Sequence, residues 1–217
     1  MSTNDGSDAP FLEWAVAGRP MPGEDKSGDV ATVQTSNSRC VLAVIDGLGH
    51  GAEAAAAAAV AVSVIERNRG EPLIPLLLLA HEHLADSRGV AATVAIVDGE
   101  TGRLDWAGVG NVNGVVFRVD DTVRPRTHGV FLHRGVLGYI MPDLHIPEPV
   151  QLTDGDFLVL ATDGIRGDVV AALHPELPVT RMAETILNDQ ATEDDDALVL
   201  VARFRCTRSG SARDRAR

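Results

Sequence analysis

The sequence predicts an α+β fold in which two antiparallel β-sheets pack as a β-sandwich, with helices on the outside. Short apolar or β-branched runs precede and follow one long helical region, and a last helix and strand close the chain. Clusters of Gly, Pro, Asn and Ser separate these runs, as is typical of strands joined by turns. With 217 residues, 45% of them hydrophobic, the chain is long enough for one domain with a substantial core.

The first half of the chain contains strand signals followed by helix signals. Alanine-rich residues 52–68 have the length and composition of a helix, and Pro72 can occupy the first turn of a second helix that runs to about Ser87. The three runs before them are too short for helices and are rich in apolar or β-branched residues. The predicted strands are 11–18, 29–35 and 39–45.

The second half returns to strands. The closing run, 197–204, is almost continuously apolar, which is typical of a strand in the middle of a sheet. Two helical stretches, 168–173 and 179–190, precede it. The other predicted strands are 90–97, 104–109, 114–119 and 157–161.

Composition divides the chain into a single domain and two short ends. Residues 1–10 are polar and acidic and are expected to be flexible, whereas 11–205 carry the apolar patterns of one folded domain. Residues 206–217 are mainly Ser, Gly and Arg and are expected to be a disordered tail.

Charge and cysteine content exclude several classes of function. The net charge of −12 opposes a nucleic-acid partner, and no apolar run reaches the roughly 18 residues that a membrane span needs. The start of the chain lacks the basic and apolar regions of a secretory signal. Cys40 and Cys206 are too few for a disulfide framework. We therefore expect a soluble cytoplasmic protein with free thiols and no nucleic-acid or membrane partner.

Four aspartates lie where predicted strands meet turns, and they carry the functional prediction. They are Asp29, Asp46, Asp163 and Asp195. A carboxylate at a strand end is held by rigid backbone and can point into a shared cleft, and Mg²⁺ and Mn²⁺ prefer such oxygen ligands. A single Asp-Gly pair can equally be an ordinary turn, so the inference depends on the set.

The segments around these aspartates resemble a known family. Ile45-Asp-Gly-Leu-Gly-His-Gly-Ala-Glu-Ala54 is the longest, and Ala161-Thr-Asp-Gly-Ile165 and Asp195-Asp-Ala-Leu-Val-Leu200 follow it in order. Ser27-Gly-Asp29 precedes them. Together with Pro22-Gly-Glu24 and Gly108-Val-Gly-Asn-Val112, they resemble the SpoIIE-like branch of the metal-dependent (type 2C, PPM) serine/threonine phosphatases, most of all the small single-domain RsbX-type proteins. The resemblance extends from about Trp14 to Phe204.

The resemblance implies a centre of two divalent cations, Mn²⁺ or Mg²⁺, that activate water. Asp46 would bridge the two ions, and Asp29 with the carbonyl of Gly47 would complete the first. Asp163 and Asp195 would hold the second, with the neighbouring Asp196 as the alternative to Asp195.

His50 has two possible roles. It can be the general acid that protonates the leaving oxygen, or a structural histidine beside the site. In the wider family the comparable histidine follows the Asp-Gly pair directly, whereas here Leu48 and Gly49 intervene.

The leading functional hypothesis is hydrolysis of phosphoserine or phosphothreonine on a bacterial regulatory protein. The resemblance implies a substrate of the stressosome scaffold or anti-sigma antagonist type. One alternative is a catalytically silent module of the same fold that binds a phosphoprotein, and another is a phosphoesterase for small molecules. All four aspartates are present, which favours an enzyme over a silent module.

Overall fold

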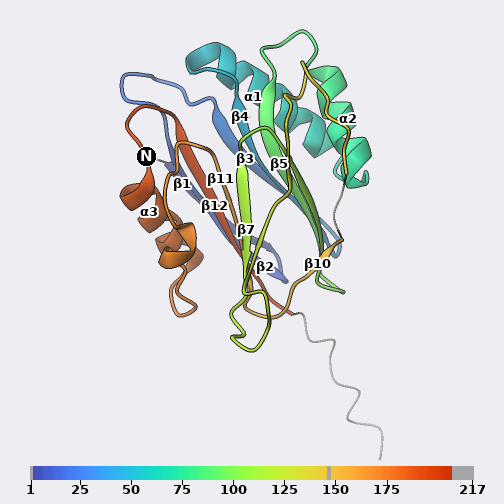
Figure 1. Ribbon diagram of the computed structural model, residues 1–217, viewed down its shortest axis with the longest axis vertical. Coiled ribbons are helices and arrows are strands. Elements are labelled where there is room, and N and C mark those ends of the chain that lie inside the picture. The colour runs from blue at the N-terminus through green and yellow to red at the C-terminus, as the bar shows by residue number, and fades with distance from the viewer. Residues whose placement is uncertain (1, 146–147, 207–217) are drawn as a thin grey trace, which may run out of the picture.

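The computed structural model of the protein describes residues 2–145 and 148–206, and it shows two six-stranded sheets packed face to face (Figure 1). Helices α1 (Gly51–Arg67) and α2 (Leu73–His83) cover the outer face of one sheet. Helix α3 (Val179–Gln190) covers the outer face of the other. The predicted α+β sandwich is therefore confirmed.

The sheet under α3 is antiparallel throughout, and the closing strand of the chain lies in its interior. The near-continuous apolar strand β12 lies between β2 and β11, as its composition predicts. In spatial order the strands are β1 (Ser2–Ala9), β2 (Leu12–Arg19), β12 (Ala197–Phe204), β11 (Phe157–Ala161), β7 (Asn113–Phe117) and β8 (Thr127–Gly129).

The sheet under α1 and α2 is antiparallel except for one short strand. Strand β9 (Leu132–His133) pairs with β6 in parallel. The sequence analysis did not predict β8, β9 or β10, which have only two or three residues each and therefore no detectable periodicity. The other strands, in order, are β10 (Val150–Gln151), β6 (Arg103–Val109), β5 (Val90–Asp98), β4 (Arg39–Gly47) and β3 (Asp29–Ser36).

Strict alternation of side chains divides each central strand between two cores. In β4, Leu42 and Val44 point into the core between the sheets. Their neighbours Ala43 and Ile45 point the other way, against α1 and α2. Successive residues of a strand face opposite sides, so both faces of β4 are buried between Cys40 and Ile45, and every position there is apolar. The same division holds for β12 between the inter-sheet core and α3.

The helical segments agree with the predicted ranges, apart from one end. Helix α2 stops at His83 rather than near Ser87, because the Ser87 hydroxyl donates a hydrogen bond to the Leu84 carbonyl (2.7 Å) and closes a turn there. The predicted helical stretch 168–173 is a 3₁₀ helix, η1 (Val169–Ala172), capped by Asp168, whose carboxylate accepts from the Val170 amide (3.0 Å).

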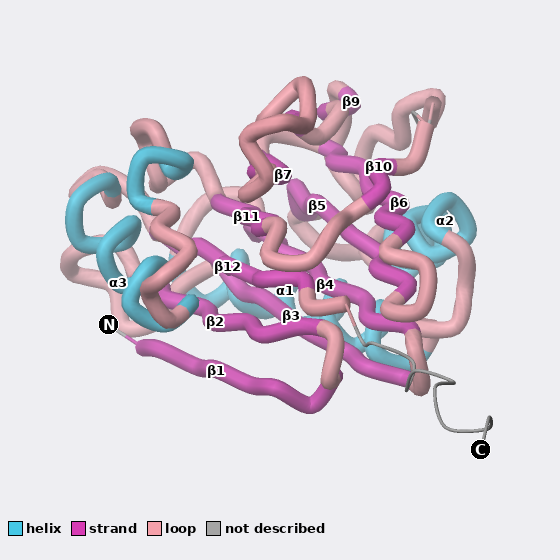
Figure 2. The backbone as a smooth tube through the Cα atoms, turned by 90° about the horizontal axis from the view of Figure 1, so that it is seen from below, coloured by secondary structure: helices cyan, strands magenta, loops and turns pink. Residues whose placement is uncertain are grey.

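The N-terminal segment differs from its expected flexibility. Residues Ser2–Ala9 form strand β1, which pairs antiparallel with β2 along the edge of the sheet (Figure 2). Backbone hydrogen bonds to an open sheet edge need no apolar side chains, so the polar composition of 1–10 gave no strand signal. Of the tail predicted at 206–217, residues 207–217 lie outside the described residues. Both cysteines are free thiols, Cys40 buried and Cys206 exposed.

One ion pair is buried at the end of the sandwich opposite the acidic strand ends. The fully buried Asp156 accepts from Arg118 Nη1 (2.7 Å) and from the backbone amides of Thr153 (2.9 Å) and Val119 (3.2 Å). Removing one partner of such a pair leaves the other charge buried without compensation.

We predict that Asp156→Ala lowers the free energy of unfolding by about 3 kcal/mol, because Arg118 would remain buried without its carboxylate. Urea unfolding followed by circular dichroism measures this. Asp105→Ala is the matched control, because Asp105 pairs with Arg103 on the surface (2.8 Å) and such pairs contribute less than about 1 kcal/mol. Equal losses in the two variants would contradict the prediction.

Candidate metal centre

Polar side chains follow the inter-sheet core at one end of the sandwich. In four strands, β3, β4, β11 and β12, a series of inward-facing apolar residues leads at this end to a polar residue on the same face. Because alternate residues of each strand point between the sheets, four polar groups lie in one region there. They are Asp29, Asp46, Thr162 and Asp196.

Asp29 and Asp46 lie opposite each other, and a hydrogen bond connects Asp29 to the other sheet. They are directly paired in the register of β3 and β4, so their side chains are neighbours on one face. Asp29 is only 8% exposed, and its Oδ2 accepts from the Thr162 hydroxyl (2.7 Å). The Thr162 hydroxyl also accepts from the Leu198 amide (2.9 Å). Thr162 thus fixes the position of Asp29 from the facing sheet.

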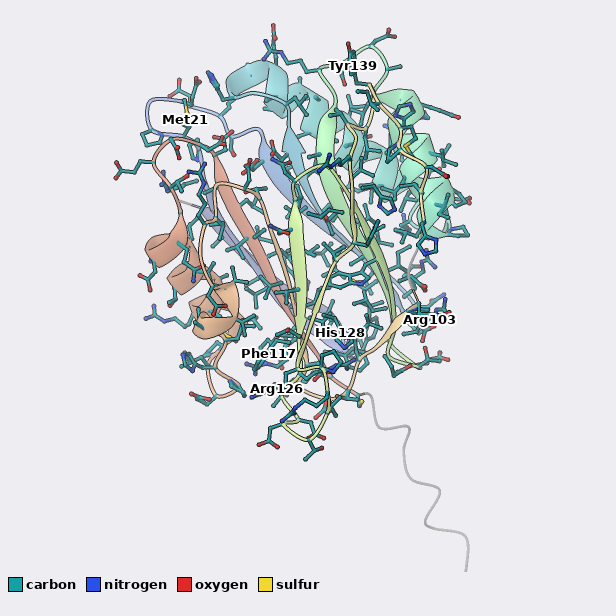
Figure 3. All side chains as sticks on the ribbon, in the orientation of Figure 1. Met21, Arg103, Phe117, Arg126, His128 and Tyr139 are labelled. Carbon is teal, nitrogen blue, oxygen red and sulfur yellow. The ribbon has the colours of Figure 1, made fainter. Side chains whose placement is uncertain are left out.

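An open cleft of about 360 Å³ lies at this end of the molecule. Asp46, Asp163 and Asp195 line it, so the structure brings these three predicted residues together. Asp29 lies behind Asp46 and is buried. The remaining lining residues are Met21, Leu48, Gly49, His50, Asn111 and Asp194. Figure 3 labels Met21 at this end of the sandwich.

The two neighbouring aspartates 195 and 196 have different surroundings. Asp196 is buried, and its two carboxylate oxygens accept from the amides of Met21 (2.7 Å) and Gly28 (2.7 Å). It therefore holds the segment that leads into Asp29. Asp195 is half-buried, faces the cleft and, among the described residues, accepts only from the Asp196 amide (2.9 Å). Of the two, Asp195 is the one with oxygens available to a ligand in the cleft.

The carboxylates disfavour one another's ionised form. Burial, followed by the charge of Asp46, raises the pKa of Asp29 to about 8, although the hydrogen bond from Thr162 opposes this. Burial, followed by the charges of Asp163 and Asp195, raises the pKa of Asp46 to about 7. Burial also raises the pKa of Asp195. A cation bound between these carboxylates would therefore stabilise their ionised forms.

The donor chemistry of the cleft fits hard divalent cations. Within residues 2–145 and 148–206, no group of three or more His, Cys, Asp or Glu side chains is already arranged to coordinate a metal ion. Three further carboxylates, Asp163, Asp194 and Asp195, nevertheless line the cleft with Asp46, and Gly47 lies in the same strand end. Oxygen donors of this kind are the ligands of Mg²⁺ and Mn²⁺.

The glycines of both Asp-Gly pairs allow backbone segments to approach closely. A Cβ atom on Gly47 would lie 2.2 Å from the Ala54 carbonyl oxygen in α1. A Cβ on Gly164 would lie 1.9 Å from the Asp196 carbonyl oxygen. Each glycine therefore lets the segment after an aspartate pack against a second element of the site.

His50 forms a pair with an acidic residue at the rim of the cleft. It is the N-cap residue of α1, and its Nδ1 lies 2.7 Å from Glu24 Oε1. Glu24 also packs over Gly51 in the first turn of α1, where the helix dipole stabilises a carboxylate. His50 is exposed and reaches the cleft, so both predicted roles are compatible with its position.

Several residues of the site were missed by sequence reasoning. Asn111, in the turn after β6, donates from Nδ2 to Asp163 Oδ2 (2.7 Å) and also hydrogen-bonds to Asp46, which lowers the pKa of Asp46. Extending the alternation of β11 by one position would have identified Thr162. Glu24 and Asn111 belong to segments 22–24 and 108–112, which carry the family resemblance, but the sequence does not indicate their contacts, because these depend on loops from different elements.

The comparisons with known proteins agree with this geometry. The family model "Stage II sporulation protein E (SpoIIE)" matches residues 36–205. No curated protein matches the chain. A solved structure from work on the bacterial stressosome as a modular system adapted to control secondary messenger signaling is 30% identical, covers 88% of this chain and 99% of its own, and has a TM-score of 0.82.

Two further solved structures share the fold at lower identity. RsbX in complex with magnesium is 17% identical, with a TM-score of 0.81, over 94% of this chain and 100% of its own. The PP2C phosphatase domain of SpoIIE from Bacillus subtilis is 17% identical, with a TM-score of 0.70, over 94% of this chain and 64% of its own.

The chain has the fold of PP2C-type phosphatase structures. The chain belongs to the SpoIIE family.

The raised pKa values predict how stability depends on pH when divalent cations are removed. Between about pH 4 and pH 8, Asp29 and Asp46 hold protons in the folded chain that free aspartates have released, so the folded state binds more protons than the unfolded state. In a chelator, the free energy of unfolding should therefore fall by more than about 1 kcal/mol as pH rises through this window. Urea unfolding at several pH values measures it.

Two variants test the source of this pH dependence. Asp29→Asn should reduce the slope, because it removes one of the two carboxylates that stay protonated in the folded chain. Asp98→Asn should retain it, because turn hydrogen bonds from Thr101 lower the pKa of Asp98, so that group titrates below the window. A slope unchanged by Asp29→Asn would contradict the assignment.

Proposed function

We propose that the chain hydrolyses phosphoserine or phosphothreonine on a bacterial regulatory protein, with water activated by divalent cations. The observation that carries this proposal is the convergence of Asp46, Asp163 and Asp195, from three separate parts of the chain, on one cleft of a SpoIIE-family domain. The buried Asp29 supports the set from behind. Structures of the same fold contain magnesium in RsbX and two manganese ions in PstP.

The positions of the oxygens support two ligand sets. Asp29, Asp46 and the Gly47 carbonyl belong to the paired ends of β3 and β4 and would hold one cation. Asp46, Asp163 and Asp195 line the cleft and would hold the second. When bound, two divalent cations lower the pKa of a shared water and neutralise the charge that develops on the phosphoryl group.

The remaining polar residues of the site keep these oxygens in place. Thr162 donates to one oxygen of Asp29, which leaves the other oxygen as a ligand. Asn111 donates to one oxygen of Asp163 in the same way. Asp196 accepts from two backbone amides and so fixes the segment before Asp29. Ligands held by hydrogen bonds in this way lose less conformational freedom on binding.

The pair formed by Glu24 and His50 supplies a proton donor. The Glu24 carboxylate accepts from Nδ1 of His50, which leaves Nε2 to exchange a proton with a group in the cleft. A serine or threonine alkoxide is a poor leaving group, and proton transfer to it contributes typically a hundredfold or more to the rate. We assign this role to His50, with Glu24 as the residue that orients the ring.

The proposal extends to the partner and the location of the protein. We take the substrate to be a phosphorylated protein of the stressosome scaffold or anti-sigma antagonist type, because a relative with 30% identity comes from work on the bacterial stressosome. Two free cysteines are consistent with the reducing cytoplasm, where we place the protein. No described helix is long and apolar enough to cross a membrane.

We predict that Asp46→Asn lowers turnover of a phosphoserine protein by roughly a thousandfold, because it removes the charge shared by both proposed cation sites. Stability in chelator should be retained or increased, since the change also removes a repelling charge. Phosphate release and urea unfolding measure the two effects.

Asp98→Asn is the matched control for activity, because Asp98 only accepts turn hydrogen bonds from residues 100 and 101. Its turnover should equal that of the wild type. If folded Asp46→Asn kept near-normal turnover, the two-cation assignment would fall. The two-cation assignment would also fall if the wild-type chain were inactive with added Mn²⁺ or Mg²⁺. That outcome would favour the catalytically silent binding module.

We predict that His50→Gln and Glu24→Gln each lower kcat/KM for a phosphoserine peptide, by roughly a hundredfold and tenfold respectively. Neither should change hydrolysis of p-nitrophenyl phosphate by more than about twofold, because p-nitrophenolate leaves without a proton. His174→Gln, an exposed histidine near Glu176, is the control. Equal losses on both substrates would show that His50 has only a structural role.

A further inference from the structure

Three large apolar side chains are exposed beside the acidic cleft. Leu48 lines the cleft and is 38% exposed, whereas Tyr139 and Ile140 are 79% and 55% exposed. Figure 3 places Tyr139 at the same end of the sandwich as Met21, which also lines the cleft. Isolated exposed apolar residues are common, but an aromatic and an aliphatic residue side by side near a functional site indicate an interaction surface.

Tyr139 and Ile140 lie on a turn that hydrogen bonds hold rigidly. Within residues 136–140, called the 136–140 turn below, the Val136 amide donates to the Ile140 carbonyl (2.9 Å), and the Ile140 amide donates back to Val136 (2.8 Å). The Gly138 amide donates to Nδ1 of His81 on α2 (3.0 Å). A turn fixed at several points presents its side chains with little loss of conformational entropy on binding.

Backbone contacts connect the 136–140 turn to the cleft. The Leu48 amide donates to the Gly89 carbonyl (3.1 Å), and Leu137 and Val90 exchange two backbone hydrogen bonds (3.0 and 2.9 Å). Gly89 packs against the base of the turn, since a Cβ added there would lie 2.6 Å from Val136 Cγ1. Leu48, Gly89 and the turn are therefore successive neighbours, so the exposed residues of the turn lie on the Leu48 side of the cleft.

The other rim of the cleft has a different character. Asp194 and Arg166 form an exposed ion pair there (3.4 Å), next to Asp195. Ile74, another exposed apolar residue, lies on α2 in a different pocket, with Arg39 and Arg103. A protein whose phosphorylated residue enters the cleft must cover its surroundings, and the 136–140 turn offers it apolar contacts there.

Net charge also bears on the kind of contact. The chain carries −12 and a phosphoprotein substrate carries added negative charge, so long-range electrostatic steering does not favour their encounter. Affinity must come from short-range contacts, and a rigidly presented tyrosine is a residue type that dominates such interfaces.

We propose that Leu48, Tyr139 and Ile140 form the docking surface for the phosphoprotein substrate, which contacts them with an apolar patch next to its phosphorylated residue. This inference rests on the proposed function and identifies where the substrate protein binds. The surface confers preference for a protein over a small phosphoester.

The test compares a protein substrate with a small one. The probes are a phosphorylated anti-sigma antagonist or stressosome scaffold protein that the wild-type chain dephosphorylates, and p-nitrophenyl phosphate. Tyr139→Ala combined with Ile140→Ala should raise KM for the phosphoprotein by roughly tenfold or more, with kcat unchanged, because truncated anchor residues typically cost that much affinity. Hydrolysis of p-nitrophenyl phosphate should stay within about twofold of the wild type.

Controls separate docking from folding, self-association and loss of the proposed function. Ile74→Ala, an exposed apolar residue on α2, should behave as the wild type on both substrates. An unchanged KM for the phosphoprotein in the double variant, or equal losses on both substrates, would overturn the docking proposal alone. Wild-type hydrolysis of p-nitrophenyl phosphate without any phosphoprotein turnover would overturn the proposed function and the docking proposal together. A wild-type dimer in analytical ultracentrifugation that the double variant abolishes would assign the surface to a second copy instead.

Discussion

The face-to-face packing of the two sheets is the constraint on which the site depends. It places the ends of β3 and β4 opposite those of β11 and β12, and it therefore holds Asp29, Asp46 and Asp196 in one region although their charges repel. An apolar core between the sheets supplies the energy that keeps these carboxylates together. The pKa of Asp29 is raised because the packing buries this carboxylate next to another negative charge.

Neutral hydrogen bonds moderate the conflict without removing the charge. Thr162 and Asn111 donate to Asp29 and Asp163, and each leaves one carboxylate oxygen of its partner for another ligand. Asp196 is different, because both of its oxygens accept from backbone amides. The two adjacent aspartates thus differ in role: Asp196 binds the backbone of the segment before Asp29, and Asp195 faces the cleft. A charged residue with every oxygen engaged serves structure, whereas one with free oxygens serves chemistry.

The fold tolerates wide sequence change because its requirements are general. RsbX superimposes with a TM-score of 0.81 at only 17% identity. The core needs alternating apolar residues of suitable size, which many sequences provide. The site needs particular residues, such as Gly47 and Gly164, where a side chain would collide with a neighbouring backbone. The surface around the cleft, including Tyr139, needs neither apolar core residues nor particular site residues. Its residues can therefore vary with the binding partner.

The sequence by itself determined the strands and helices with clear periodicity and the four aspartates at strand ends, because alternation and turn residues are local properties. It could not indicate that polar residues 2–9 form an edge strand, since β1 depends on backbone pairing with β2. Nor could local patterns show that Asp195 faces the cleft while Asp196 binds backbone amides, identify Thr162 as the partner of Asp29, or pair Glu24 with His50. Those relations join residues far apart in the chain, and only the packing of the two sheets and their loops decided them.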